Sequence, residues 1–238
     1  MTWHGVYLHG FASGPGTAKG VALGRRLAGC LASYTIPDLE GGDFRGLTMD
    51  GILDRAEAAL AALPADGGRV LLIGSSLGGY TAAHLAATGR ARRATALLLI
   101  APAFGFTSRW AERLGAEGVA RWHAAGAWPF YHHVREREEL LGSGFLTSCE
   151  RLPDFPADPG LPVAIVHGRQ DETVDHRASV EYARRHPLAE LHLVHGDHRL
   201  TDPRHEDLIT WVAKDLMSHH GDSTVTPVRQ GSASPRPA

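Results

Sequence analysis

The chain has 238 residues, of which 43% are hydrophobic and 21% are charged, and its formal net charge is −2. This composition is that of an ordinary globular protein. It lacks the basic excess that attracts nucleic acid, so we expect no nucleic-acid partner. A chain of this length can form one large core, and we expect a single domain over residues 1–218. Residues 219–238 are rich in Ser, Thr, Pro and Gly and are predicted to form a disordered tail.

The sequence contains no sign of membrane insertion or export. No apolar stretch approaches the ~20 residues of a membrane span, and residues 1–10 have neither the basic nor the apolar region of a signal peptide. We therefore expect a cytoplasmic protein. Cys30 and Cys149 lie far apart and lack metal-ligand spacing, so we expect both thiols to be reduced and inert.

Short apolar runs alternate with amphipathic or alanine-rich segments along the chain. The predicted strands are residues 4–9, 33–37, 70–73, 95–101, 161–166 and 191–195. The predicted helices are residues 17–31, 49–63, 77–88, 177–185 and 203–217. This alternation predicts an α/β fold with a doubly wound, mostly parallel sheet of about six strands. Residues 107–158 are too many for a direct crossover and are expected to form a helical cap insertion.

The segment RVLLIGSSLGGY, residues 69–80, joins a predicted strand to a predicted helix. Its residues 74–78 fit the pattern G-x-S-x-G, in which a strained turn lifts a serine hydroxyl above the edge of a sheet. The alternative is a plain Gly/Ser turn, but the buried strand before the motif and the helix after it are the context that the motif requires. We therefore predict Ser76 as a nucleophile and assign Ser75 a structural role.

Chemically active side chains follow several predicted strands. Active sites of parallel α/β sheets lie at the carboxyl ends of the strands. Ser76, Asp171 and His198 each follow a different strand, in the chain order that α/β-hydrolases use for serine, acid and histidine. This order predicts a catalytic triad in which His198 is the general base and Asp171 orients it.

Neighbouring residues offer alternatives for the base and the acid. His195 also lies at the end of the last strand and is the second candidate for the base. Glu172, Asp175 and Asp197 compete with Asp171 for the acid. We expect Asp175 to cap the following helix and Asp197 to shape the loop before His198.

Three segments of the chain, HGFxSGP, GSSLGG and HGRQDETV, carry a family resemblance. Through them, residues 2–217 resemble the α/β-hydrolase superfamily, and in particular the small YqiA-like esterases. The resemblance implies a compact serine hydrolase that acts on acyl esters or thioesters. Asp171 matches the acid of the family pattern HGxxDxxV, and the family's oxyanion hole implies the backbone N–H groups of Phe11 and Leu77.

The expected cap is rich in aromatic residues, which serve either as the core of the cap or as the lining of an acyl pocket. The candidates for the substrate pocket are Phe104, Trp128, Phe130, Tyr131 and Phe145. His132 and His133 are expected on the surface of the cap. No histidine pair fits a metal-ligand motif, and the Gly-rich loop before Lys19 lacks the Gly-Lys-[Ser/Thr] run of a phosphate loop. We therefore expect neither a metal nor another cofactor.

These inferences favour a serine hydrolase that cleaves carboxylic esters of small or medium acyl chains through an acyl-enzyme. The same triad would serve an acyl thioesterase or an acyltransferase, so both remain alternatives. A hydrolase fold used only as a binding module is the alternative from a different class, although such proteins usually lose a triad member. The oligomeric state and the natural substrate are left open.

Overall fold

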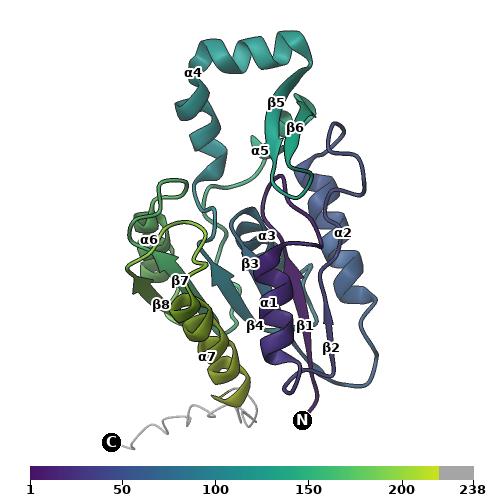
Figure 1. Cartoon of the computed structure of the whole chain (residues 1–238), viewed down its shortest axis with the longest axis vertical. Helices are drawn as coiled ribbons and strands as arrows, with labels where there is room; N and C mark the ends of the chain where they lie inside the picture. Colours follow the sequence, from purple (N-terminus) through teal and green to yellow (C-terminus); the bar gives the residue numbers. More distant parts are fainter. Residues whose placement is uncertain (220–238) are drawn as a thin grey trace, which may run out of the picture.

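A six-stranded sheet forms the centre of the protein in the computed structural model, which describes residues 1–219 (Figure 1). The strand order is β2-β1-β3-β4-β7-β8, and every neighbouring pair is parallel. The strands are β1 (Trp3–Leu8), β2 (Ser33–Thr35), β3 (Arg69–Ser75), β4 (Ala94–Ile100), β7 (Val163–Gly168) and β8 (Ala189–Val194). The predicted doubly wound sheet of about six strands is therefore confirmed.

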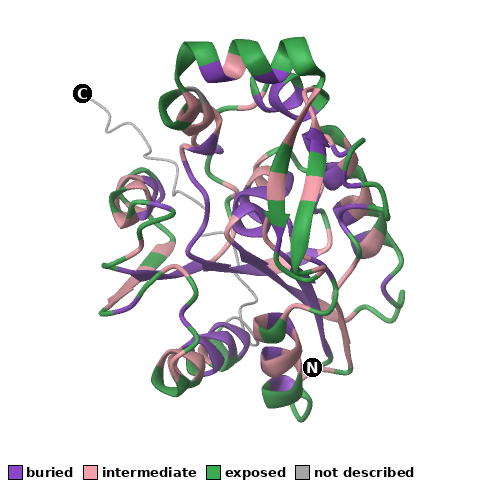
Figure 2. Ribbon diagram, turned by 45° about the horizontal axis from the view of Figure 1, so that its top comes forward, coloured by how far each residue is buried: buried purple, intermediate pink, exposed green. Residues whose placement is uncertain are grey.

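The strands are apolar on both faces because helices cover both sides of the sheet. Figure 2 shows the result, with buried strands inside and the exposed residues on the outer faces of the helices. The covering helices are α1 (Ala18–Leu27), α2 (Met49–Ala61), α3 (Leu77–Ala87), α6 (His176–Arg185) and α7 (Pro203–His219). Val70 and Leu72 of β3 belong to one core with α2, α3 and α6, whereas Leu71 and Ile73 belong to the opposite core with α1 and α7.

The insertion between β4 and β7 differs from the wholly helical cap that the sequence predicts. It contains α4 (Phe106–Ala125) and α5 (Gly144–Cys149), and between them an antiparallel hairpin of β5 (Ala127–His132) and β6 (Arg137–Gly142). Helix α4 is kinked at Gly115, which has a positive φ of 67°. Figure 1 places α4 and the hairpin at the top of the molecule, above the sheet.

The hairpin is attached to the core by backbone hydrogen bonds. The N–H of His133 donates to the carbonyl of Ala12 at 2.8 Å, in the loop after β1. The N–H of Gly142 donates to the carbonyl of Arg45 at 2.9 Å, in the loop before α2. The cap therefore contacts both loops that leave the first two strands.

Three further expectations concern the ends and the surface of the chain. His219 is the last residue of α7, and the rest of the predicted tail, residues 220–238, lies outside the described residues. Within residues 1–219, no helix has the length and apolar character needed to cross a membrane. Both cysteine thiols are free, with Cys30 exposed and Cys149 buried.

Candidate active site

Ser76 lies on a strained turn between β3 and α3. Its φ is 54°, a left-handed value that is uncommon for a residue with a side chain. A Cβ at Gly74 would overlap the backbone carbonyl of Gly78, and a Cβ at Gly78 would overlap the carbonyl of Leu8. The two glycines of the motif are therefore required because strand β1, the turn and the start of α3 approach one another closely.

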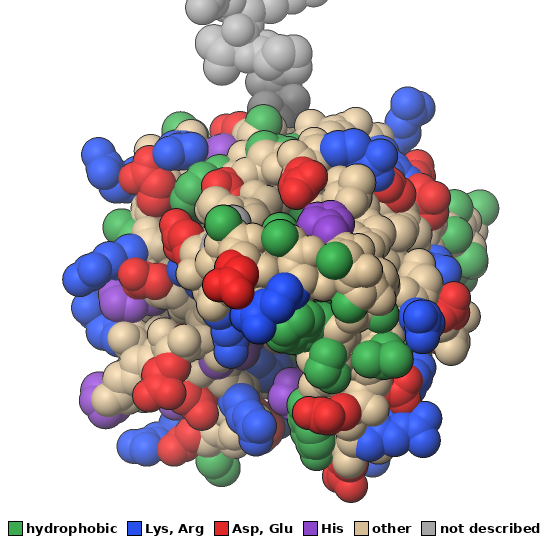
Figure 3. Space-filling view, turned by 90° about the horizontal axis from the view of Figure 1, so that it is seen from above, with side chains coloured by type: hydrophobic (Ala, Val, Ile, Leu, Met, Phe, Trp, Pro, Cys, Tyr) green, Lys and Arg blue, Asp and Glu red, His purple; other side chains and the backbone are tan. Residues whose placement is uncertain are grey.

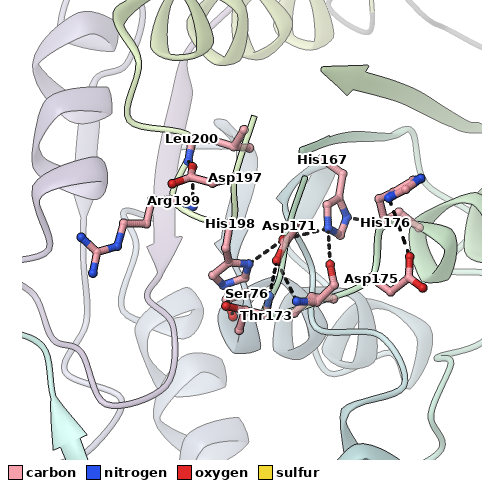
Figure 4. Close-up of polar contacts among 12 residues, drawn as sticks. Ser76, His167, Asp171, Thr173, Asp175, His176, Asp197, His198, Arg199 and Leu200 are labelled. Carbon is pink, nitrogen blue, oxygen red and sulfur yellow. Dashed lines mark hydrogen bonds and ion pairs between the residues drawn. The ribbon is translucent and has the colours of Figure 1, made fainter. Parts of the chain in front are cut away.

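The three residues of the expected triad are joined by hydrogen bonds (Figure 4). The Oγ of Ser76 lies 3.1 Å from Nε2 of His198, and Nδ1 of His198 lies 2.7 Å from Oδ2 of Asp171. Because an ionised carboxylate only accepts, Nδ1 of His198 carries the hydrogen, and Nε2 accepts from the serine hydroxyl. The Asp171 side chain is fully buried, whereas that of His198 is 22% exposed, so solvent and substrate reach the imidazole side.

Asp171 is held by more donors than His198 alone. Nε2 of His167 lies 3.0 Å from Oδ2, and the backbone N–H groups of Thr173 and Val174 donate to Oδ1 at 2.8 and 2.7 Å. Burial by itself would raise the pKa of Asp171, but the hydrogen bonds from His167, His198 and Val174 outweigh it and hold this pKa well below the usual range. The carboxylate is therefore kept ionised beside His198.

The other candidates for base and acid lie outside this network. The side chain of His195 is exposed. Asp197 accepts hydrogen bonds from the N–H groups of Arg199 and Leu200, and so it shapes the loop that carries His198. Asp175 caps α6 by accepting from the N–H of Arg177 at 2.9 Å. The structure thus brings together the three side chains that the sequence selects and leaves these alternatives elsewhere.

The N–H groups expected for the oxyanion hole come from loops on either side of Ser76. Leu77 is the first residue of α3, and Phe11 lies in the loop after β1. A Cβ on Gly10 would be 3.3 Å from the Cβ of Ser76, so this loop lies against the serine. Within the described residues, the N–H groups of Phe11 and Leu77 form no backbone hydrogen bond. They remain available to an oxygen atom at the switch point between β1 and β3, where ligands of such sheets bind.

Sequence reasoning did not assign a role to His167 or Lys19. His167 contacts Ser179 through Nδ1 at 2.7 Å and Asp171 through Nε2, so it connects α6 to the expected acid. Lys19 of α1 donates to Oγ of Ser75 at 3.3 Å, next to the expected nucleophile. Burial lowers the pKa of Lys19 to about 8, although Asp197, Asp171 and Glu206 partly oppose this effect. The one signal for His167 in the sequence was that it precedes a glycine at the end of a predicted strand. His9 stands in the same context, so this signal does not single out His167.

Aromatic side chains from the cap and the core meet beside Phe11. This aromatic cluster consists of Phe11, Phe44, Trp110, Trp122, Phe130 and Phe145. The ring centroids of Phe130 and Phe145 lie 5.4 and 5.5 Å from that of Phe11. Two of the five residues predicted for the pocket are therefore in contact with Phe11, in the loop after β1.

The other three predicted pocket residues lie elsewhere. Phe104 is fully buried and stacks on Tyr182 of α6, with 4.1 Å between ring centroids, so it belongs to the core. Tyr131 is 53% exposed and contacts His133 on the outside of the hairpin. Trp128 is half-buried, and the guanidinium of Arg121 lies 5.9 Å from its ring centroid. Phe130 and Tyr131 are neighbours in a β-strand, so their side chains point to opposite faces. The helix that the sequence predicts here would not separate neighbouring side chains in this way.

The prediction that His132 lies on the surface is wrong. Only 1% of His132 is exposed, and its Nε2 lies 2.8 Å from Oε2 of Glu40, which is itself 4% exposed. Arg135 approaches the same oxygen at 3.5 Å. Burial raises the pKa of Glu40, and the contacts with His132 and Arg135 oppose this rise. The contact between Glu40 and His132 connects the cap to the loop after β2. His133, in contrast to His132, is exposed as predicted.

The surroundings of the site carry charges of both signs. Figure 3, which looks onto the cap, shows acidic and basic side chains interspersed over this face rather than a field of one sign. In residues 1–219, no three His, Cys, Asp or Glu side chains are arranged to hold a metal ion.

Comparison with known proteins identifies the family and the fold. The Uncharacterised protein family UPF0227 matches residues 4–210 of the chain. A putative hydrolase from Agrobacterium vitis S4 has a TM-score of 0.79 and 25% identity, over 90% of this chain and 88% of that one. A search of curated proteins found no significant match.

Two further solved structures have a similar fold at lower identity. Mouse alpha/beta hydrolase domain-containing protein 10 has a TM-score of 0.75 and 23% identity, over 91% of this chain and 90% of that one. Est1E from Butyrivibrio proteoclasticus, with ferulic acid bound, has a TM-score of 0.75 and 22% identity, over 92% and 90% of the two chains. The family match covers most of the chain, and the TM-scores show that the fold is shared with these structures. The chain therefore belongs to the UPF0227 family and has the α/β-hydrolase fold.

Proposed function

We propose that this protein is a serine hydrolase that cleaves carboxylic esters of small or medium acyl chains through an acyl-enzyme. The observation that carries the proposal is the continuous chain of hydrogen bonds from Ser76 through His198 to Asp171. A serine hydroxyl is a weak nucleophile at neutral pH and needs a base within hydrogen-bond reach. His198 meets this requirement, and Asp171 fixes the tautomer that leaves Nε2 free to accept a proton.

The first half of the reaction transfers the acyl group to the enzyme. Oγ of Ser76 attacks the ester carbonyl carbon while its proton passes to Nε2 of His198. The carbonyl oxygen becomes an oxyanion, and the N–H groups of Phe11 and Leu77 stabilise it. The buried carboxylate of Asp171 stabilises the imidazolium. His198 then gives the proton to the departing alkoxide, which leaves as an alcohol, and Ser76 is left as an acyl ester.

The second half uses water as the nucleophile. His198 takes a proton from a water molecule as the water oxygen attacks the acyl carbon, and the same two N–H groups bind the second oxyanion. When this intermediate collapses, the C–O bond to Ser76 breaks and His198 returns a proton to Oγ. The products are a carboxylic acid and the free enzyme, so atoms and charges balance over the cycle.

The proposed substrate class is supported by the fold and by the walls of the site. Proteins with similar folds include Est1E, which is known with ferulic acid bound, and a monoacylglycerol lipase from Paleococcus ferrophilus with a TM-score of 0.66. Aromatic side chains of the cap surround Phe11, and an apolar acyl group fits such walls. A short acyl chain would lie between these rings and the triad.

The nucleophile can be tested by mutation and by covalent labelling. Ser76→Ala should reduce the hydrolysis of p-nitrophenyl butyrate on the order of 10⁴-fold, because only a hydroxyl is lost and the turn is kept. Ser75→Ala is the matched control and should retain most of the activity. A fluorophosphonate probe should modify Ser76 and not Ser75, as read by mass spectrometry. A Ser76→Ala variant that keeps a tenth of the wild-type rate would overturn the proposal.

The same triad can cleave thioesters or pass the acyl group to another alcohol. Parallel assays of butyryl esters and butyryl thioesters, with and without added short alcohols, separate these reactions. For the proposed esterase, the ester should give the higher kcat/KM, and water should remain the main acceptor. A large excess of thioester cleavage or of transfer product would replace the esterase assignment with one of these alternatives.

A further inference from the structure

A small cavity lies beside the residues proposed for the oxyanion hole. Phe11 and Leu77 line it, together with Gly10, which lies against Ser76. The remaining apolar walls include the side chains of Leu39, Leu47 and Ile52. Its volume is about 10 Å³, which is room for roughly one water-sized group. A substituent close to the carbonyl of a bound ester could therefore enter it, but a long chain could not.

Glu40 brings a carboxylate to this apolar cavity. Its Oε2 is close to His132 and Arg135, at 2.8 and 3.5 Å. Its Oε1 is buried and has no hydrogen-bond partner among the residues that the structure describes. Buried carboxylate oxygens are normally satisfied because removing one from water without a donor is unfavourable. This oxygen therefore needs a donor that the described protein does not provide.

The other polar side chain of the cavity cannot be this donor. His9 donates from Nδ1 to the carbonyl of Gly10 at 2.9 Å, and its Nε2 accepts from the N–H of Leu39 at 3.2 Å. Both ring nitrogens are thus used, and neither faces Glu40 as a free donor. Glu40 is thus the lining residue with an unsatisfied acceptor, and apart from Glu40 and His9 the lining side chains are apolar.

We infer that Glu40 selects esters whose acyl group carries a hydroxyl on the second or third carbon, by accepting a hydrogen bond from that hydroxyl at Oε1. The inference deepens the proposed function and rests on it. The inference places the carbonyl oxygen at the N–H groups of Phe11 and Leu77, and the second and third carbons of the acyl group at the cavity that these two residues line. A hydroxyl brings one donor for one acceptor, whereas an ammonium group would bring three, and a methyl group brings none.

Selection of this kind acts mainly by rejecting the substrate that lacks the hydroxyl. When a plain acyl group displaces water from the cavity, Oε1 loses its donor, and this loss disfavours the transition state for that ester. Sites built around a buried polar group discriminate against such analogues strongly, by up to about 10⁴-fold or more. For a single hydroxyl at a partly apolar site, we expect a preference of at least about 10-fold in kcat/KM.

The test compares esters that differ only in one hydroxyl. Hydrolysis of methyl butyrate, methyl 2-hydroxybutyrate and methyl 3-hydroxybutyrate is followed by pH-stat titration with the full chain. One hydroxylated ester should exceed methyl butyrate by at least about 10-fold in kcat/KM. In Glu40→Leu this ratio should fall towards 1, whatever the effect on absolute rates. His132→Leu is the matched variant, because it also removes the contact between His132 and Glu40 but keeps the Glu40 carboxylate. In this variant the kcat/KM ratio of hydroxylated to plain ester should stay high.

Each other outcome has a definite meaning. A wild-type ratio near 1, with methyl butyrate hydrolysed, would overturn the inference and leave the proposed function standing, because the cavity would then hold only water. Equal loss of the ratio in both variants would also overturn it, since selectivity would depend on the position of the cap rather than on Oε1. If Glu40→Leu fails to fold, the wild-type ratio decides: a ratio of at least about 10 supports the inference, and a ratio near 1 overturns it. A failure of the proposed function itself would appear as no ester hydrolysis and no labelling of Ser76.

Discussion

Nε2 of His167 lies 3.0 Å from Oδ2 of Asp171, the same oxygen that faces His198. The opposite nitrogen of His167 is close to Ser179 of α6 at 2.7 Å. Because the serine hydroxyl can donate to Nδ1, the His167 tautomer that donates to Asp171 is fixed. Asp171 is thus oriented from two sides, by His198 at the front of the site and by His167 behind it.

His167→Leu should therefore impair catalysis without removing any proposed catalytic group. Loss of a hydrogen bond to a charged group is worth about 1.5–3 kcal/mol, so kcat should fall roughly 10-fold or more while KM changes little. Since one donor to Asp171 is lost, the pKa of this carboxyl should rise, and the stability that it contributes should be lost at a higher pH on acidification. His195→Leu, at an exposed strand end, is the control and should match the wild type. A His167→Leu enzyme with wild-type kcat and with wild-type pH dependence of urea unfolding would contradict the role given to His167.

Asp171→Asn should reduce the rate far more than the same change at neighbouring acids. The amide would favour the histidine tautomer that cannot accept from Ser76, and comparable changes in other triads cost about 10⁴-fold in kcat. Asp175→Asn and Asp197→Asn should stay within a few-fold of wild type, because these side chains cap α6 and the loop after β8. Ester hydrolysis by the three variants is the measurement. Asp197→Asn as the most damaging change would transfer the acid role to that residue.

Acid should remove the stability that Asp171 contributes. Its pKa is lowered in the folded protein, so its contribution is complete above the ordinary aspartate pKa of about 3.9 and is lost progressively below it. At pH 6 the wild type should exceed Asp171→Asn by roughly 2 kcal/mol in the free energy of unfolding. The difference should shrink as the pH falls from about 4 to 2. Urea unfolding at several pH values measures it, and a difference independent of pH would refute the linkage.

Lys19 should have the opposite linkage. Its folded pKa of about 8 lies below the ordinary lysine value, so the protonated form is disfavoured by folding at every pH below 8. Stability should then rise with pH from about 8 to 10.5, as the folded protein releases this proton before the unfolded chain does. Lys19→Met should raise the free energy of unfolding by about 1 kcal/mol at pH 7, after the loss of the contact with Ser75 is included. The increase should be smaller at pH 10. Lys214→Met, on exposed α7 surface, is the control.

Phe130 offers a test of the acyl pocket. Its ring contacts Phe11, so Phe130→Ala should open space beside the site and shift the preference towards longer acyl chains. Each added methylene in an apolar pocket is worth roughly 1 kcal/mol, or about five-fold in kcat/KM. Tyr131→Ala, on the exposed side of the same strand, should leave the profile unchanged. The profile over two-, four- and eight-carbon p-nitrophenyl esters decides, and identical profiles would leave Phe130 a purely structural role.

The sequence predicted the sheet well because its strands are apolar runs between helices. Residues 70–73 and 95–101 were recognised as strands, and the structure extends the first to Arg69–Ser75 and shifts the second by one residue. Such segments are buried on both faces, so local composition and tertiary environment agree. The residues of the proposed triad could be selected from the sequence for the same reason, because the end of a strand can be located from the apolar run that precedes it.

The hairpin of the cap was missed for an equally physical reason. Strand β5 contains Pro129, half of the residues of β6 are charged, and the pair forms a small, partly exposed sheet whose alternation is weak. The contact between Glu40 and His132 joins residues 92 apart in the sequence, one in a loop and one in that hairpin. No local pattern marks such a pair, because only the folded arrangement brings its members together.

The hydrogen bond between His133 and Ala12 has a consequence for how a substrate can enter. Ala12 follows Phe11 directly and is itself in a left-handed conformation, with φ of 49°. Lifting the hairpin as a rigid flap would pull on this residue and displace the neighbouring N–H of Phe11, which we propose as a donor to the oxyanion. In the proposed mechanism, the hairpin therefore cannot open as a rigid flap while the N–H of Phe11 stabilises the oxyanion.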